Sequence, residues 1–416
     1  MEFTKKISVG FFRPILSIVS ASVIGQLFLL AILPLVTYLY TPAQLGGLAI
    51  CLGVINVIAV ISGLRYEVAI PLVKLNKHAR LLSTIIVQFN LFFSGVALIA
   101  ISVLYLLFLD PQQRHDHNAI ILIPIGIFCV GMYRLVSFSL VRQSEFKVLS
   151  YSKMVQAFVN GSCQILLGYI YSSSVFLVIA FILGQATAFI LMKVKCNLKL
   201  WQKNYKASLC LLKKYRRFPK YDAPAALVDT LSSQLPNLFL AIVFEPVIAG
   251  IYLLAERVVS APMAIVSQAI GQVYYAKLTG ISCAHKRQRN LLQVVTSLFI
   301  LAIVFFLCFY FVATYILSIL FSGEWQQVIN VIKIIVVGCC FQLIYSPLSM
   351  VLMATNGQRV NFFINLSLLL FKLIALLIGW SHNNFEYFLI GFSFSNSVVY
   401  LIAIFVVMKR TKSLME

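Results

Sequence analysis

Charged residues are scarce in this sequence, and acidic residues are the scarcest. Only 11% of the 416 residues are charged, with 12 Asp or Glu against 33 Lys or Arg. Soluble domains carry about 25% charged residues, so this content excludes an ordinary soluble globular protein. Apolar residues make up 61% of the chain, and the mean hydropathy is +0.96. An integral membrane protein is the class that remains.

The motifs of catalytic and metal-binding sites are also missing. The sequence contains no Walker A, HExxH or GxSxG motif and no paired His and carboxylate cluster. Its nine cysteines are scattered and without CxxC spacing, which indicates neither a disulfide framework nor a zinc site. The two His and two Asp of Asp110–His117 are typical of a hydrated outer loop. We therefore expect no enzyme, no metal and no cofactor.

Long apolar segments occupy most of the chain. A helix needs about 20 mostly apolar residues to cross a bilayer, and twelve segments meet this length. The ten-residue alternating segments of an outer-membrane barrel are missing. The sequence therefore predicts an all-α integral membrane protein with about 12 transmembrane helices. The segments are 14–36, 43–64, 81–109, 118–140, 152–170, 175–192, 222–244, 247–275, 291–317, 328–354, 360–379 and 385–408.

The positive charges are distributed unevenly between the two sides of these segments. One side carries 28 Lys and Arg, the other carries Arg114 alone, and four lie within the segments. Cytoplasmic loops carry the excess of Lys and Arg, so we expect both termini in the cytoplasm. Most of the net charge of +21 then reflects the orientation of the chain in the membrane. No basic soluble domain is left that would bind nucleic acid.

The longest cytoplasmic connection, 193–220, divides the segments six and six. This predicts an N-terminal lobe 1–192, a linker 193–220 and a C-terminal lobe 221–416. In the linker, apolar residues share one helical face and lysines lie largely on the other, which is typical of a helix in the headgroup layer. A solvated basic linker or a calmodulin-type target is the alternative. The apolar face consists of Leu198, Trp201, Tyr205, Leu209 and Leu212.

The two halves share a short repeat. Tyr40-Thr41-Pro42 followed by Gly46 matches Phe244-Glu245-Pro246 followed by Gly250 at an offset of 204 residues. Both matches fall at the outer hairpin between the first two segments of their half. Six is an even number, so duplicated halves run in the same direction, as in transporters built from parallel repeats. This favours two lobes around a central cavity.

Charges inside the segments are candidates for function, because charges in a membrane are costly and usually face a cavity. The in-membrane cations outnumber the acids. A cationic cavity suits an anionic substrate, and arginine offers a planar fork for phosphate oxygens. A transporter of organic cations would favour an acidic cavity. The candidate cavity residues are Arg257, Arg65, Arg134, Lys372, Asp229, Glu256 and Gln234.

Other interpretations of these charges stay open. Lys333, Arg65 and Glu67 lie near the interfaces, where their side chains could snorkel toward water. Arg257 could form a buried pair with Glu256 or with Asp229 that only orients two helices. For Arg134 and Lys372 no acidic partner is evident, which favours exposure to the cavity. Gln234 could hydrogen-bond a polar substrate or join two helices.

Several stretches resemble the polysaccharide-transport family, the Wzx-type flippases of the MATE-like MOP exporter superfamily. The stretches are Gly63–Pro71, Gln234–Pro236, Ala249–Tyr252 and Glu256–Val258 with Pro262, Ser322–Trp325, Ser346–Leu348, and Asn356–Gln358. The resemblance implies two six-helix bundles that open alternately to each side of the bacterial inner membrane. It also implies that Arg13, Arg65 and Arg257 occupy places comparable to the arginines of a cationic cavity in related flippases.

The resemblance further implies a substrate and partners. The substrate would be an undecaprenyl-diphosphate-linked oligosaccharide, flipped to the periplasmic leaflet for O-antigen or similar surface polysaccharide. Partners would be membrane lipids, a polysaccharide polymerase and a chain-length regulator. The alternatives are a MATE-like multidrug or cation antiporter, and a membrane glycosyltransferase or polymerase. The latter would need a catalytic acid or base and a large outer loop, and the predicted outer connections are short.

Overall fold

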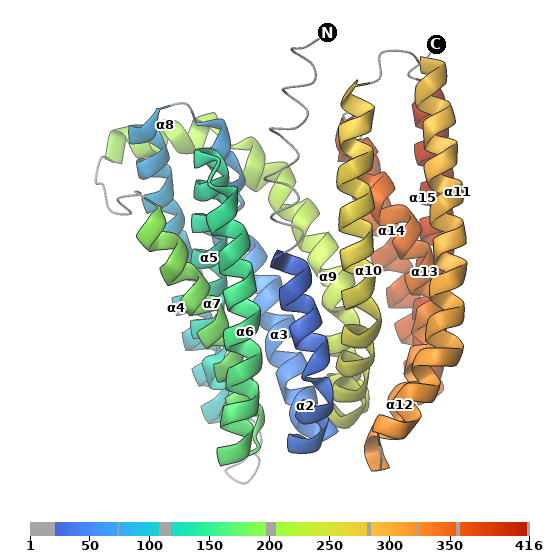
Figure 1. Cartoon of the computed structure of the whole chain (residues 1–416). Helices are drawn as coiled ribbons and strands as arrows, with labels where there is room; N and C mark the ends of the chain where they lie inside the picture. Colours follow the sequence, from blue (N-terminus) through green and yellow to red (C-terminus); the bar gives the residue numbers. More distant parts are fainter. Residues whose placement is uncertain are drawn as a thin grey trace. The chain divides into compact units, whose positions relative to one another are not determined.

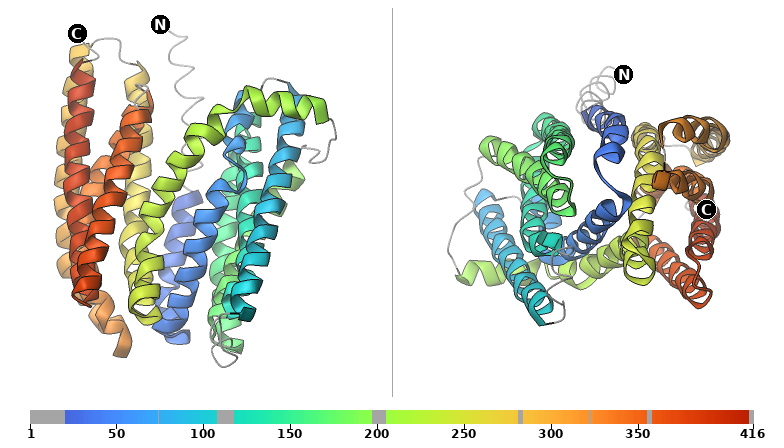
Figure 2. Two further views of the ribbon diagram at one scale, coloured as in Figure 1. Left: turned by 180° about the vertical axis from the view of Figure 1, so that it is seen from behind. Right: turned by 90° about the horizontal axis from the view of Figure 1, so that it is seen from below.

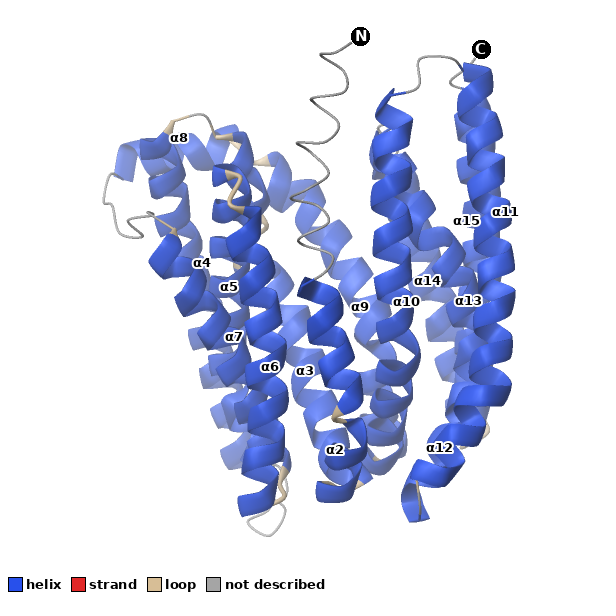
Figure 3. Cartoon of the chain, in the orientation of Figure 1, coloured by secondary structure: helices blue, strands red, loops and turns tan. Residues whose placement is uncertain are grey.

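The structure is a computed structural model that describes residues 21–73, 75–107, 118–196, 205–280, 284–321, 323–354 and 358–413. Across these ranges the chain forms helices and short loops and no strand (Figure 3). Eleven helices are long and apolar enough to cross a membrane, which confirms the all-α, multi-pass membrane fold. The cytoplasmic position of the termini stays a prediction, and Arg13 lies outside the described residues.

The predicted segment 152–170, which is not among these eleven helices, also forms a helix. It lies within α6 (Phe146–Ile170), a helix of 25 residues. At 1.5 Å per residue this helix is about 37 Å long, more than the hydrocarbon thickness of about 30 Å. Its composition is less apolar than that of the eleven helices above, because polar residues such as Gln156, Asn160 and Gln164 recur along it.

The chain divides into two compact units, Met1–Ala241 and Ile242–Glu416. The predicted lobes, drawn from the count of segments, stay a prediction. Unit 1 contains α6, the helical residues 21–31 and the further helices and turns of this part of the chain in Figure 1. They are α2 (Leu33–Leu39), α3 (Pro42–Ser62), the 3₁₀ helix η1 (Tyr66–Leu72), α4 (Asn76–Leu107), the 3₁₀ helix η2 (Asn118–Leu122), α5 (Ile123–Gln143), α7 (Ser174–Lys195), α8 (Tyr205–Lys214), the π-helical turn η3 (Phe218–Asp222) and α9 (Ala223–Phe239).

Helix α3 is central to unit 1 and packs against α4, α5, α7 and α9. Thr41 caps its first turn through a reciprocal pair of hydrogen bonds with Gln44. Small residues allow its neighbours to approach closely. A Cβ atom at Gly53 would lie 2.6 Å from Leu238 Cδ2 of α9. This close approach packs the C-terminal end of α9 against α3.

Unit 2 follows the π-helical turn η4 (Leu240–Phe244), within which the boundary between the units falls. Its central helix α13 packs against α10, α11, α14 and α15, and Figure 2 shows these yellow to red helices from behind and from below. The elements are α10 (Pro246–Gly280), α11 (Ala284–Leu307), the π-helical turn η5 (Cys308–Ala313), α12 (Thr314–Leu320), the 3₁₀ helix η6 (Gly323–Gln326), α13 (Gln327–Ala354), α14 (Gln358–Ser381) and α15 (Phe385–Ser413).

The prolines of the short repeat have the same structural role in both units. Pro42 begins α3 and Pro246 begins α10. Proline suits the first helical turn, where its missing N–H would have no helical partner. The repeat therefore marks equivalent helix starts, at the second span of unit 1 and the first long helix of unit 2.

Part of the predicted linker forms α8, in which Leu211 is buried and Lys213 and Lys214 are exposed. The linker as a basic amphipathic segment stays a prediction. Leu212 packs against the apolar cluster around Tyr66, whose hydroxyl donates a hydrogen bond of 3.3 Å to the Leu212 carbonyl. The apolar face of α8 thus has a partner within unit 1. Leu198 and Trp201 lie outside the described residues, and a position of α8 in the headgroup layer stays a prediction.

Candidate functional site

The site in unit 1 begins with an unusual turn after α3. Leu64 and Arg65 have φ angles of 47° and 59°, so two consecutive residues with side chains adopt the left-handed region. Such residues cost of order 1–3 kcal/mol each and cluster at functional sites. Backbone hydrogen bonds from Leu64 to Ile61 and from Tyr66 to Gly63 close the turn. The turn ends α3 abruptly and leads directly into η1.

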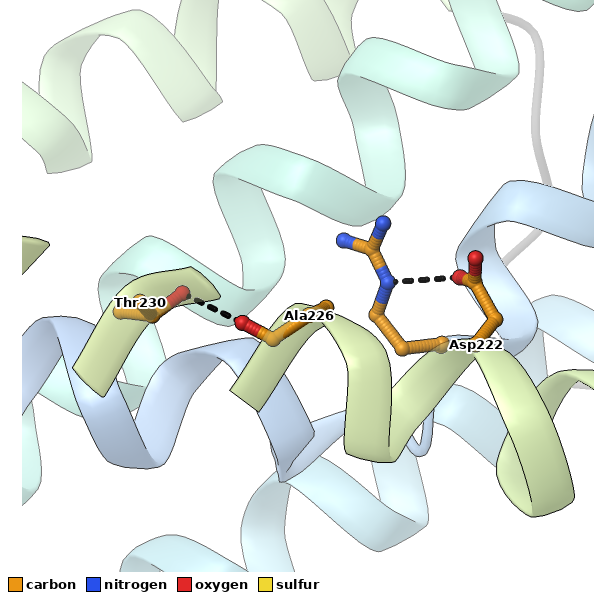
Figure 4. A network of polar contacts seen from close by, with 4 residues as sticks. Asp222, Ala226 and Thr230 are labelled. Atoms are coloured by element: carbon orange, nitrogen blue, oxygen red, sulfur yellow. Dashed lines mark hydrogen bonds and ion pairs between the residues drawn. The ribbon is translucent and has the colours of Figure 1, made fainter. Parts of the chain in front are cut away.

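Arg65 is held by an ion pair with an acid far along the chain. Its Nε donates a hydrogen bond of 2.9 Å to Oδ2 of Asp222, the last residue of η3 (Figure 4). The two side chains are 22% and 42% exposed, so the pair is open to water. Among the described residues this bond engages only Nε, and the terminal amino groups of Arg65 remain available to a ligand.

Glu67 lies next to this ion pair, but it is buried. It is 2% exposed on η1, and its Oε2 has no hydrogen-bond partner among the described residues. A Cβ atom at Gly63 would lie 2.5 Å from Oε2, so the carboxyl occupies the space that this glycine leaves. The snorkelling alternative does not apply to Glu67.

The surroundings of Glu67 change its acidity. Burial raises the pKa of Glu67 above its ordinary value, because the charged form loses hydration. A backbone hydrogen bond and the positive charges of Arg65 and Arg134 act in the opposite direction, and the negative charge of Asp222 raises the pKa further. The net direction is upward, so this carboxyl holds its proton more readily than an exposed glutamate.

Arg134 of α5 completes the cluster. Its side chain is half-buried, and its buried Nη1 atom has no hydrogen-bond partner among the described residues. Glu67 lies within electrostatic range of Arg134, which corrects the expectation that no acidic partner is near. A buried donor without a partner costs about 1–3 kcal/mol, and more if it is charged. A ligand oxygen that reached Nη1 would recover this cost.

The other predicted residues of unit 1 lie on α9. Asp229 is on the exposed surface, seven residues and therefore about 10 Å beyond Asp222 along the helix. Gln234 is half-buried, five residues further. Two polar contacts lie along this stretch of the chain (Figure 4). One is the ion pair of Asp222, in the turn directly before α9, and the other is the hydrogen bond from Thr230 Oγ1 to the Ala226 carbonyl. The structure thus brings Arg65 and Arg134 together and places Asp229 and Gln234 further along α9.

Unit 2 carries a separate group of predicted residues. Glu256 and Arg257 lie on α10, and Arg257 is half-buried within electrostatic range of Glu256. Lys372 of α14 is 5% exposed, and its Nζ lies 4.5 Å from the centre of the Phe392 ring. Cys339 of α13 is within electrostatic range of both Glu256 and Lys372. Lys372 therefore packs inside unit 2 against an aromatic ring, and a role in substrate binding stays a prediction.

Lys333 fits the snorkelling alternative. Its side chain is exposed, and its Nζ lies 5.8 Å from the centre of the Tyr310 ring. Within the described residues no three His, Cys, Asp or Glu side chains gather as metal ligands do.

Asp222 was not recognised as a site residue from the sequence, whereas Glu67 was considered and left open to the snorkelling alternative. Asp222 was placed only at the start of the seventh segment, without a link to Arg65. One signal was present, since Asp222 is the first acid after Glu145 and directly follows the run of cations in the linker. An isolated acid at the same ends of the segments as Arg65 is a natural partner for it.

The comparisons with known proteins agree with this fold. A family model described as "Polysaccharide biosynthesis protein" matches residues 35–330. No curated protein sequence matches the chain. Among solved structures, the lipid II flippase MurJ in an inward closed conformation has a TM-score of 0.71 at 13% identity, covering 98% of this chain and 89% of its own.

Two transporters of the same superfamily are also similar. An inward-facing multidrug resistance MATE transporter has a TM-score of 0.65 at 11% identity, covering 96% of this chain and 95% of its own. A MOP superfamily transporter from Pyrococcus furiosus has a TM-score of 0.59 at 12% identity, covering 97% and 96%. These neighbours in fold are transporters and flippases rather than enzymes. The chain therefore belongs to the polysaccharide biosynthesis protein family and is a multi-pass membrane protein with the MOP transporter fold.

Proposed function

We propose that this protein flips an undecaprenyl-diphosphate-linked oligosaccharide from the cytoplasmic to the outer leaflet of the bacterial inner membrane. The repeat unit would serve the assembly of O-antigen or a similar surface polysaccharide. Membership in the polysaccharide biosynthesis family and the transporter fold support the general activity. The observation that supports a diphosphate is the cluster of Arg65 and Arg134, with a buried guanidinium nitrogen that has no partner among the described residues.

The chemistry of this cluster suits a phosphate group. Guanidinium groups bind phosphate oxygens through two parallel hydrogen bonds, which are stronger than bonds between neutral groups. Arg65 would offer its terminal amino groups and Arg134 its orphaned Nη1. Gln234 would contact sugar hydroxyls, and Arg257 stays a proposed substrate-binding residue of unit 2. The prenyl chain would stay in the lipid while the transporter opens alternately to each side of the membrane.

Charge-neutralising variants in the native host test this function. Arg134→Gln and Arg65→Gln should cause lipid-linked repeat units to accumulate and surface polysaccharide to disappear, at unchanged protein level. Arg216→Gln is the matched control, because Arg216 is exposed next to α8 and lies outside the cluster. Normal polysaccharide display in both cluster variants would contradict the assignment of these arginines.

A cation antiporter is the second candidate, because the MATE transporter noted above has the same fold. This function predicts resistance to cationic drugs when the protein is overproduced, without any change in lipid-linked sugars. A strain that lacks this protein distinguishes the flippase from the antiporter. Accumulated lipid-linked oligosaccharide supports the flippase, and drug sensitivity with normal polysaccharide supports the antiporter.

A further inference from the structure

We propose that Glu67 is an internal counter-ion that takes up a proton when a phosphate group occupies Arg65 and Arg134. In the empty site the carboxylate balances these two arginines. In the loaded site the phosphate balances them, and Glu67 becomes a neutral carboxylic acid. This inference rests on the proposed function, since it requires that the cluster receives a phosphate.

The geometry separates Glu67 from an ordinary salt-bridge partner. It is 2% exposed, its Oε2 accepts no hydrogen bond among the described residues, and it forms no ion pair there with either arginine. Glu67 therefore lies within electrostatic range of both arginines but forms an ion pair with neither. A carboxylate bound tightly by an arginine fork would compete with the ligand for the same donors.

The groups that face Glu67 are few. The elements packed against η1 are α4, α5 and η3. Helix α5 contributes Arg134, η3 contributes Asp222, and the preceding turn contributes Arg65. On the α4 side the neighbour of the carboxyl region is the apolar Ile86, 3.2 Å from the Cβ position of Gly63. Besides burial and a backbone hydrogen bond, the charges that act on Glu67 in the described structure are therefore those of two cations and one acid.

The charge balance explains why a proton is needed. Two arginines and two carboxylates make the empty cluster neutral. The proposed substrate is a diphosphate esterified at both ends, so each of its phosphates carries about one negative charge, and its arrival leaves an excess of negative charge in a partly buried site. Like charges in one site raise the pKa of one member. The proton from solvent goes to a Glu67 carboxylate oxygen, and no bond to the phosphate forms or breaks.

Glu67 rather than Asp222 is the acid that should take this proton. The Asp222 side chain is 42% exposed and can remain hydrated as an anion. Glu67 is buried, and burial already raises its pKa. Removing the favourable effect of the two arginines would raise it further. Phosphate binding is therefore linked to proton uptake and becomes tighter as the pH falls.

Calorimetry on the purified full-length protein tests this linkage. Farnesyl diphosphate, a short prenyl diphosphate, is titrated at one pH in buffers of different ionisation enthalpy, which yields the protons bound per ligand. The wild type should take up about one proton more per diphosphate than Glu67→Gln. Glu145→Gln is the control, since Glu145 is an exposed acid at the start of α6, and it should match the wild type.

The outcomes are distinct. Equal proton uptake by the wild type and Glu67→Gln, with diphosphate bound, overturns this inference and leaves the proposed function standing. No binding of farnesyl diphosphate to the wild type overturns both. Should Glu67→Gln fail to fold, infrared difference spectra of the wild type decide. A protonated carboxyl band that grows on binding supports the inference, and its absence overturns it.

Discussion

Arg65 and Asp222 are 157 residues apart in the sequence and are joined by a hydrogen-bonded ion pair of 2.9 Å. The pair fastens the left-handed turn after α3 to the residue directly before α9. It holds one arginine of the candidate phosphate site in a fixed place, and it also gives that arginine a competing anion. Changes at this pair should therefore affect stability and ligand binding in opposite directions.

Replacing Asp222 by Asn should leave the fold nearly unchanged and strengthen phosphate binding. Ion pairs exposed to water contribute about 0–1 kcal/mol, so the free energy of unfolding should fall by no more than that. Loss of the competing carboxylate should tighten farnesyl diphosphate binding by about fivefold, equivalent to about 1 kcal/mol. Calorimetry on Asp222→Asn and on the control Glu145→Gln checks this. Weaker binding in Asp222→Asn would show that Asp222 serves the ligand rather than competing with it.

Adding one methyl group at Gly63 should disturb the site through Glu67. The φ angle of Gly63 is −93°, which any residue adopts, so only the space matters here. The new Cβ would lie 2.5 Å from Oε2 of Glu67 and would push the carboxyl away from its place. Small displacements at functional sites are costly, and we expect surface polysaccharide to fall by about tenfold or more in Gly63→Ala.

Gly95→Ala is the matched control for this change. It inserts the same methyl group into α4, where no atom lies within 4 Å of the Cβ position. Polysaccharide quantified from cells with equal protein levels should be normal for Gly95→Ala. Equal loss in both variants, or in neither, would contradict the claim that the Glu67 carboxyl needs the space at Gly63.

The stability of the protein should depend on pH through Glu67. Its pKa in the folded chain is raised above the ordinary value of 4.5, so the folded state holds this proton to a higher pH than the unfolded chain. The stabilisation is fully present below pH 4.5 and is lost as the pH rises through the folded pKa. Glu67→Gln stays neutral throughout.

Thermal unfolding in detergent over a pH series tests this sign. The Tm of the wild type relative to Glu67→Gln should decline as the pH rises from 4.5 through the folded pKa. Glu145→Gln removes an exposed acid and should follow the wild type at every pH. A Tm difference that stays constant, or that moves in the opposite direction, would mean that the pKa of Glu67 is not raised in the folded chain.

Removing the hydroxyl of Tyr66 should loosen α8 without altering the apolar core. Tyr66→Phe loses the bond to the Leu212 carbonyl but keeps the ring that stacks on Phe89 at 6.4 Å. A lost hydrogen bond of this kind costs about 0.5–1.5 kcal/mol. Trypsin should cleave faster at the exposed Lys213 and Lys214. Cleavage as slow as in the exposed-tyrosine control Tyr171→Phe would show that this bond does not hold α8.

The helices could be predicted from the sequence because each apolar run is long and no other structure satisfies its backbone in a membrane. Helix α6 is not among the eleven described helices that are long and apolar enough to span, since polar residues lower its hydropathy. The amphipathic pattern of α8 predicted its helix and its exposed lysines. The sequence did not reveal that its apolar face packs on the cluster around Tyr66, because a face toward protein and a face toward lipid have the same composition.

The site was harder to predict than the helices. Arg65 and Arg134 could be chosen because cations near or inside a membrane are rare and costly. Their acidic neighbours could not be assigned, since the link between Arg134 and Glu67 depends on how α5 is rotated about its axis. The link between Arg65 and Asp222 depends on the packing of α9 against α3. Neither the rotation of α5 nor the packing of α9 can be read from the spacing of residues in the sequence.

The most direct test of the central claim is transport by the purified protein in lipid vesicles. Undecaprenyl-diphosphate-linked oligosaccharide is placed in both leaflets, and an added glycosidase that cannot cross the bilayer digests only the outer pool. With the wild type and Arg216→Gln, digestion should run to completion, whereas with Arg134→Gln it should stop when the outer pool is consumed. Digestion that stops at the outer pool in vesicles with the wild type would contradict the claim that this protein is a flippase.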